Sequence, residues 1–226
     1  MAFLPTTAKE IEALGWDYVD VILFTGDAYI DHPSFGAAVI GRLLEAEGYR
    51  VAIVPQPNWR DDLRDFRKLG APRLFFAVSG GAMDSMVNHY TANKRLRSND
   101  AYTAGGKAGF RPDYAATVYC QILKRLYPHV PVVVGGIEAS LRRLTHYDYW
   151  SDKLQRSILA TSGADLLIYG MGDKVIRDVA KAMRNGFNMK LLRGLRQVGF
   201  MADKEYVERL YSGKTIVLNS FEQCVE

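Results

Sequence analysis

The chain has 226 residues, of which 48% are hydrophobic and 24% charged, a composition typical of one large soluble α/β domain or of a domain with an appendage. Its net charge of +4 is too small to indicate a nucleic-acid partner by itself. No apolar run approaches the ~20 residues that span a bilayer, and the first residues lack a secretory signal pattern, so we expect no membrane partner. The two cysteines exclude a disulfide framework and favour a reducing, cytoplasmic setting.

The first sixty residues predict a helix, a strand, a second helix and a second strand. Residues 7–10 match a capping box that starts a short helix over residues 7–14. Residues 17–24 are rich in β-branched and aromatic side chains, residues 34–46 have a helical pattern, and residues 50–54 form a second apolar run. A strand, a helix and a strand in this order form a βαβ unit, which implies a parallel sheet.

Further helices and strands alternate along the rest of the chain. We expect helices over residues 59–69, 83–88, 114–126, 137–144, 150–160 and 174–185, and strands over residues 73–78, 131–135 and 165–169. Residues 89–113 are polar and lack periodicity, and a loop of this length in a compact domain is usually functional or mobile. Residues 215–218 form another short apolar run, which suits an edge strand or a link to a following region.

These elements define an α/β fold with three layers and a mostly parallel, five-stranded sheet. Right-handed crossovers with one reversal favour the flavodoxin-like strand order 2-1-3-4-5. We assign residues 1–186 to this domain and residues 187–226 to a C-terminal extension.

Glycine-rich and polar segments follow four of the predicted strands. In parallel sheets the loops at the carboxyl ends of strands carry the binding chemistry, and glycine lets a ligand approach the backbone closely. The candidate ligand-binding residues are Gly26, Asp27, His32, Ser79, Gly80, Gly81, Gly135, Gly136, Glu138, Gly170 and Gly172. We assign no catalytic residue and no metal ligand among them. The alternative is that the glycines only make tight turns, since no segment has the full GxGxxG pattern.

Seven segments of the chain resemble one protein family. They are residues 1–7 (MAFLPTT), 15–21 (GWDYVDV), 25–36 (TGDAYIDHPSFG), 56–59 (QPNW), 83–88 (MDSMVN), 135–143 (GGIEASLRR) and 146–150 (HYDYW). These strings resemble the opening of the YgiQ-type radical SAM proteins, and the resemblance extends from Met1 to at least Gly172. It implies an N-terminal domain of the flavodoxin-like, cobalamin-binding-like kind.

The resemblance also implies a [4Fe–4S] cluster and S-adenosylmethionine in the full-length protein. Such a cluster is held by three closely spaced cysteines, commonly CxxxCxxC, whereas this chain has only Cys120 and Cys224. We therefore expect an N-terminal portion with no such activity of its own. Its partners would be the missing C-terminal radical SAM domain of the same chain and an unknown substrate. Cys120 lies in a helical pattern, which favours a buried, inert thiol.

The loop after the first predicted strand allows two further interpretations. Mutase-type cobalamin-binding domains use DxHxxG, but here Asp31 directly precedes His32, and Gly36 follows His32 by four positions rather than three. Cobalamin is therefore possible but disfavoured, and a helix-entry role suits His32 better. Asp27, Asp31 and Glu138 are carboxylates that suit a hard cation, although such side chains more often cap helices.

Two surface segments suggest larger partners. Residues 146–150 are dense in aromatic side chains, which suits an interdomain contact or the stacking of a nucleobase. The basic loop from Lys94 to Arg111 suits contact with phosphate or RNA, or a solvated mobile lid. A free-standing domain that binds a nucleotide or another phosphorylated small molecule is a further alternative.

We also predict where the missing domain docks. A ligand at the strand C-termini needs a cover that excludes water, so this edge should expose an apolar and aromatic patch here. Residues 89–112 should be poorly ordered, because their packing partner is absent.

Overall fold

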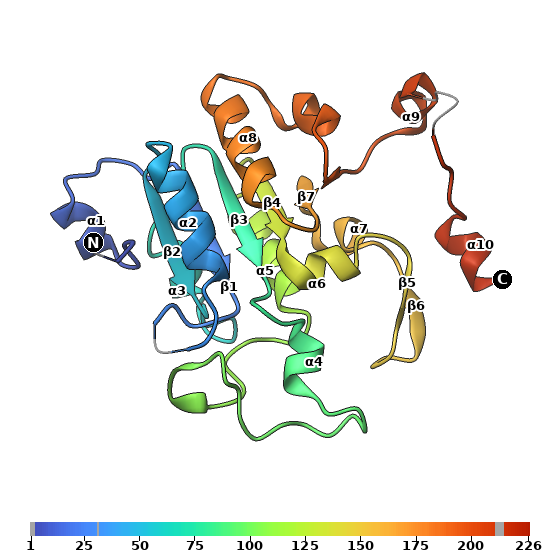
Figure 1. The fold of residues 1–226 in the computed structure, drawn as a ribbon, viewed down its shortest axis with the longest axis horizontal. Helices are drawn as coiled ribbons and strands as arrows, with labels where there is room; N and C mark the ends of the chain where they lie inside the picture. The colour runs from blue at the N-terminus through green and yellow to red at the C-terminus, as the bar shows by residue number, and fades with distance from the viewer. Residues whose placement is uncertain (1–2, 31, 211–214) are drawn as a thin grey trace.

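The computed structural model describes residues 3–30, 32–210 and 215–226, and within them the chain builds a six-stranded sheet between helices (Figure 1). In spatial order the strands are β2 (Val51–Pro55), β1 (Val21–Thr25), β3 (Phe75–Ser79), β4 (Val132–Gly135), β7 (Leu166–Ile168) and β8 (Val198–Gly199). The first five are parallel, and β8 pairs antiparallel with β7. The predicted order 2-1-3-4-5 of the parallel strands is confirmed, and the antiparallel sixth strand was not predicted.

The parallel strands coincide with the apolar runs of the sequence because helices cover both faces of the sheet. Every residue of β1 is buried. Thr25, the last residue of β1, lies opposite Pro55 of β2 and Ser79 of β3, and Ser79 lies opposite Gly135 of β4. This register brings the carboxyl ends of four neighbouring strands to one edge of the sheet.

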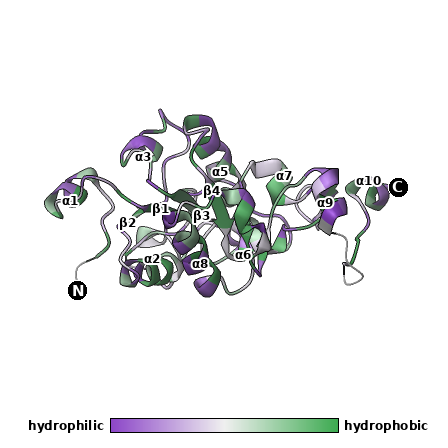
Figure 2. Cartoon of the chain, turned by 90° about the horizontal axis from the view of Figure 1, so that it is seen from above, coloured by the Kyte–Doolittle hydropathy of each residue, from purple (hydrophilic) through white to green (hydrophobic). Residues whose placement is uncertain are grey.

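Helices form a layer on each face of the sheet (Figures 1 and 2). The α-helices are α1 (Ala8–Ala13), α2 (Gly36–Ala46), α3 (Arg64–Arg67), α4 (Ser85–His89), α5 (Ala115–Leu126), α6 (Gly136–Leu141), α7 (Ile158–Ser162), α8 (Asp173–Arg184), α9 (Lys204–Leu210) and α10 (Phe221–Val225). Helices α2 and α8 pack on one face, and α3, α5 and α7 on the other. The three-layer α/β architecture is therefore confirmed.

Two local predictions are wrong, and one of two alternatives for a third segment is excluded. Residues 59–69 contain only the single turn α3. Residues 150–160 do not form one helix, because β5 (His146–Asp148) and β6 (Lys153–Gln155) pair as a hairpin. In its turn, the buried Asp148 carboxylate accepts the backbone N–H of Ser151, which favours the turn over a helix. Of the two alternatives for residues 215–218, the edge strand is not observed, since Ile216 is 85% exposed, and the link to a following region stays a prediction.

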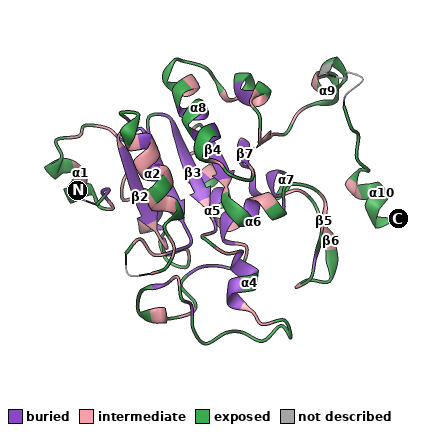
Figure 3. Cartoon of the chain, in the orientation of Figure 1, coloured by how far each residue is buried: buried purple, intermediate pink, exposed green. Residues whose placement is uncertain are grey.

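The C-terminal part of the chain leaves the sheet after β8. Figure 3 shows the parallel strands of the sheet largely buried and α9 and α10 largely exposed. Helix α10 rests beside the β5–β6 hairpin, where Arg156 pairs with Glu222 at 2.6 Å and stacks on the ring of Phe221. No helix among the described residues is long and apolar enough to cross a membrane.

Candidate functional site

A cavity of about 280 Å³ opens at the carboxyl edge of the sheet, between α2 and α8. Its wall contains seven of the predicted ligand-binding residues: Asp27, Ser79, Gly81, Gly135, Gly136, Gly170 and Gly172. Segments that lie up to 145 positions apart in the chain thus meet in one place, as the shared strand edge predicted. Whether these residues bind a ligand remains a prediction.

The inner part of the cavity is apolar. Leu23 of β1, Ala77 of β3 and Val133 of β4 contribute the sheet side, and Ile40 of α2 and Ile176 of α8 contribute the helix side. All five belong to or pack against the core on this face. The cavity is therefore a space that the small side chain of Ala77 and the strand-end glycines leave between the sheet and its two covering helices.

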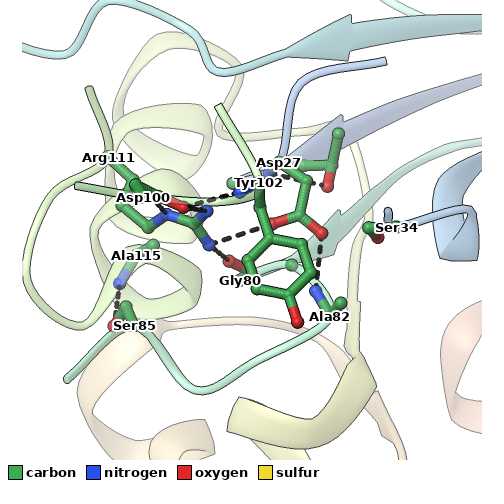
Figure 4. Close-up of polar contacts among 12 residues, drawn as sticks. Asp27, Ser34, Gly80, Ala82, Ser85, Asp100, Tyr102, Arg111 and Ala115 are labelled. Carbon is green, nitrogen blue, oxygen red and sulfur yellow. Dashed lines mark hydrogen bonds and ion pairs between the residues drawn. The ribbon is translucent and has the colours of Figure 1, made fainter. Parts of the chain in front are cut away.

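A buried ion network lies behind the cavity wall and reaches the lining through Asp27 (Figure 4). Nη1 of Arg111 lies 3.0 Å from Oδ1 of Asp27, and Nη2 lies 3.0 Å from Oδ2 of Asp100. Nη1 also donates a hydrogen bond to the carbonyl of Gly80 at 3.1 Å. The first contact lacks hydrogen-bond geometry and is an ion pair, while Oδ2 of Asp27 accepts the backbone N–H of Ala82 at 2.6 Å.

This network changes the interpretation of residues 89–113. Arg111 is 1% exposed, so it does not contribute to a basic surface. The segment has packing partners within the domain, because Tyr102 accepts a hydrogen bond from the N–H of Ala28, and Thr103 accepts one from the side chain of Gln56. The expectation that its packing partner is absent is therefore wrong. Sequence reasoning missed the pairing of Arg111 with Asp27, since nothing in the local pattern marks it.

Two strand-end glycines lie behind the cavity wall, where the backbones of β1 and β3 come close together. A Cβ on Gly26 would overlap the carbonyl of Gly80, and a Cβ on Gly80 would lie 2.5 Å from Oε2 of Glu138. These contacts give Gly26 and Gly80 a packing role.

Glu138 is fully buried beside these glycines. Its carboxylate accepts the backbone N–H of Ser85 at 2.9 Å and of Ala116 at 2.8 Å, at the beginnings of α4 and α5. Burial raises the pKa of Glu138, although these hydrogen bonds oppose the shift. The arrangement matches a helix cap. Among the described residues no group of three or more His, Cys, Asp or Glu side chains is placed to hold a metal, and Asp31 lies outside them.

His32 lies beside a small neighbouring cavity rather than in the main one. Its Nδ1 accepts the backbone N–H of Ser34 at 3.0 Å, just before α2 begins at Gly36. This contact agrees with a helix-entry role.

The β5–β6 hairpin carries the aromatic segment outside the sheet. Tyr147 and Tyr149 are 58% and 48% exposed. The hydroxyl of Tyr149 donates to the carbonyl of Ala92 at 2.6 Å, and Nζ of Lys94 lies 4.8 Å from the Tyr149 ring. The hairpin and the basic loop therefore form one surface beside α4 (Figure 1).

Fold and site together define an α/β domain with a ligand-sized cavity at the carboxyl edge of a parallel sheet. Residues 3–226 match the family model described as Radical SAM N-terminal, and the chain belongs to this family. It is 63% identical to a UPF0313 protein of Porphyromonas gingivalis over 99% of this chain and 35% of that protein. It is 72% identical to a UPF0313 protein of Bacteroides thetaiotaomicron over 80% of this chain and 29% of that protein. The chain thus spans about a third of the length of these curated relatives.

Among solved structures, the chain is similar to the radical S-adenosylmethionine methyltransferase TsrM of Kitasatospora setae, determined with cobalamin and a [4Fe–4S] cluster bound. The TM-score is 0.48 at 18% identity, over 76% of this chain and 25% of that chain.

The cysteines of this chain do not fit the iron–sulfur cluster that the family name implies. Three thiolates are needed, and the chain has two cysteines. Cys120 is buried in α5, where burial raises the pKa of its thiol, and Cys224 is exposed on α10. The prediction that Cys120 is buried is confirmed.

Proposed function

We propose that this domain is the N-terminal substrate- or cofactor-binding unit of a radical SAM enzyme, and that its ligand occupies the cavity between α2 and α8. The supporting observation is that four strand ends line one cavity of about 280 Å³ whose floor is apolar. Ligands of open α/β sheets bind at this edge. Chemistry at a [4Fe–4S] cluster with S-adenosylmethionine is proposed for the rest of the longer protein and not for these residues.

We further propose that the rest of the longer protein covers the cavity mouth. Exposed apolar side chains lie on the segments that contribute to its lining: Phe35 is 72%, Ile137 44%, Leu141 57% and Met171 80% exposed. The curated relatives are about three times as long as this chain, so they contain enough additional residues to bury such a patch. The proposed domain boundary after Gly186 falls two residues beyond the end of α8 at Arg184, and the following residues still pack against the sheet through β8.

A blocking variant tests the cavity as the binding site. Ala37 lines the cavity from α2, whereas Ala46 lies exposed at the far end of the same helix. Thermal-shift screening against nucleotides, cobalamins and small aromatic compounds should give a hit that Ala37→Trp abolishes and Ala46→Trp preserves. A hit that survives Ala37→Trp would place the ligand elsewhere.

The division of labour with the rest of the protein is tested separately. Incubation of this chain with iron and sulfide should give no stoichiometric [4Fe–4S] absorbance, because two distant thiols cannot hold the cluster. A stoichiometric cluster on this chain alone would overturn the proposal.

RNA contact is a second candidate function, favoured by the surface that the hairpin and the basic loop share. Four exposed basic side chains of the loop form no ion pair with the described residues: Lys94, Arg95, Arg97 and Lys107. Unpaired cations beside exposed tyrosines are suited to a single-stranded backbone and its bases.

Fluorescence anisotropy with a labelled single-stranded RNA tests this candidate. Affinity should fall steeply with salt, and Arg95→Gln with Arg97→Gln should weaken binding and flatten the salt dependence. The control, Lys204→Gln with Arg209→Gln on α9, removes the same charge elsewhere. Binding that is indifferent to salt, or equally weakened by both pairs of substitutions, would refute RNA contact at this surface.

A further inference from the structure

We infer that the cavity between α2 and α8 selects an uncharged, apolar group of about two fused rings and rejects a phosphorylated one. The inference rests on the proposed function, because it concerns the ligand of the same cavity. It names the chemical class of that ligand, which the glycine-rich strand ends leave open.

The size of the cavity sets the size of the group. At about 280 Å³ it has almost twice the volume of the ~150 Å³ apolar cavity that takes one benzene ring. A single ring would leave unfilled space, and a whole nucleotide would extend beyond the cavity. Two fused rings are the flat group that this volume fits.

The wall determines the polarity of the group. Apart from the mouth, the lining is aliphatic, with Ile40 and Ile176 facing Leu23, Ala77 and Val133. A polar group pushed into this space would lose its water and find no hydrogen-bond partner among aliphatic side chains. An apolar ring there keeps its contacts and loses only unfavourable hydration.

The charges at the mouth exclude a phosphate. Among the described residues, the cavity lining contains no Lys, Arg or His, and its one charged side chain is the carboxylate of Asp27. Arg111 balances that carboxylate from behind the wall, where it is shared with Asp100 and does not line the cavity. A phosphate at the mouth would therefore meet a carboxylate and no cation.

The helix ends near the cavity do not reverse this conclusion. Helices α2, α6 and α8 begin without a side-chain cap, at Gly36, Gly136 and Asp173, so their first N–H groups offer some attraction to an anion. That attraction is small and local, and it does not offset the cost of desolvating a dianion beside Asp27. Asp173 also places a carboxylate in the first turn of α8.

The mouth provides a place for one polar atom on the ring system. Oγ of Ser79 accepts the N–H of Gly81 at 3.2 Å, which leaves its own proton free to donate to a ligand. Ser34 brings a second hydroxyl to the lining from the loop before α2. A fused ring system with a hydroxyl, carbonyl or ring nitrogen at its outer end fits both the apolar interior of the cavity and its polar mouth.

Two probes that share one ring system test the inference: 1-naphthol and 1-naphthyl phosphate. Their dissociation constants are measured by titration of this chain, of Ala37→Trp and of the control Ala46→Trp. Ser34→Trp at the mouth serves as a second blocking variant in case Ala37→Trp unfolds. We expect 1-naphthol to bind at least tenfold more tightly than the phosphate, with both blocking variants losing binding and the control retaining it.

The outcomes separate the inference from the proposed function. If 1-naphthyl phosphate binds as tightly as 1-naphthol or more tightly, and the blocking variants abolish its binding, the ligand class is refuted. The cavity then remains the binding site. Naphthol binding that the blocking variants leave intact would refute both, as would no binding of either probe to the unaltered chain.

Discussion

Replacing Arg111 with leucine removes the guanidinium that pairs with two buried carboxylates. Asp27 and Asp100 are each 2% exposed, and Arg111 lies within 3.0 Å of both. Removing one partner of a buried pair typically costs about 3–5 kcal/mol, because a charge is left without compensation. The carbonyl of Gly80 also loses a donor. We therefore expect the free energy of unfolding to fall by about 3–5 kcal/mol.

This loss is large compared with the stability of a typical domain, about 5–15 kcal/mol. In a domain of this size it corresponds to a decrease in Tm of roughly 6–20 °C. Urea denaturation followed by circular dichroism measures the change, with Arg95→Leu as the control. Arg95 is an exposed arginine of the same loop, and its replacement should change stability by no more than about 0.5 kcal/mol.

A third variant separates the electrostatic cause from a packing defect. One triple variant removes all three charges together, so no unpaired charge remains: Asp27→Asn, Asp100→Asn and Arg111→Leu in the same chain. This triple variant should be more stable than Arg111→Leu alone. A loss below about 1 kcal/mol for Arg111→Leu, or a triple variant no more stable than the single one, would refute the reasoning.

Two further predictions concern Gly80 and Glu138. Gly80→Ala should cost about 1–3 kcal/mol, because the new Cβ would lie 2.5 Å from Oε2 of Glu138, and a backbone N–H holds each oxygen of that carboxylate in place. Gly36→Ala, where nothing lies within 4 Å, is the control, and equal effects in thermal unfolding would contradict this explanation. Burial raises the pKa of Glu138 above its ordinary value of 4.5, so its contribution to stability is complete below that pH and decreases as pH rises through the folded-state pKa. The stability advantage of the unaltered chain over Glu138→Gln should therefore be larger at pH 5 than at pH 8, and an advantage that stays constant or grows with pH would contradict it.

The structure also constrains which glycine variants are useful probes of binding. Gly80→Val and Gly136→Val would add bulk at the strand ends, but a Cβ on Gly136 would lie 2.7 Å from Oγ of Ser79. Gly136 also has a φ of +83°, which a β-branched residue adopts only with strain. Loss of binding in these variants would report damage to the fold, so Ala37→Trp is the better test.

The amino-acid sequence by itself determined the order and type of the main elements. The strands β1, β2 and β4 are buried because helices cover both faces of the sheet. Their residues are therefore almost all apolar, and this can be recognised in the sequence. The capping box at Thr7 and Glu10 formed as expected, since its hydrogen bonds join neighbouring residues. Right-handed crossovers then limited the order of the parallel strands, and their shared carboxyl edge indicated where the glycine segments meet.

The tertiary structure alone decided what fills and surrounds that edge. Arg111 pairs with Asp27 across 84 positions of the chain, and no local pattern specifies which of several carboxylates will lie within 3.0 Å. The β5–β6 hairpin overrode a helical pattern, because its contacts with Ala92 and Lys94 involve residues distant in sequence. The cavity is a volume left between the sheet and two helices. Such a volume depends on how whole elements pack, and packing is a property of side chains that meet in space rather than along the chain.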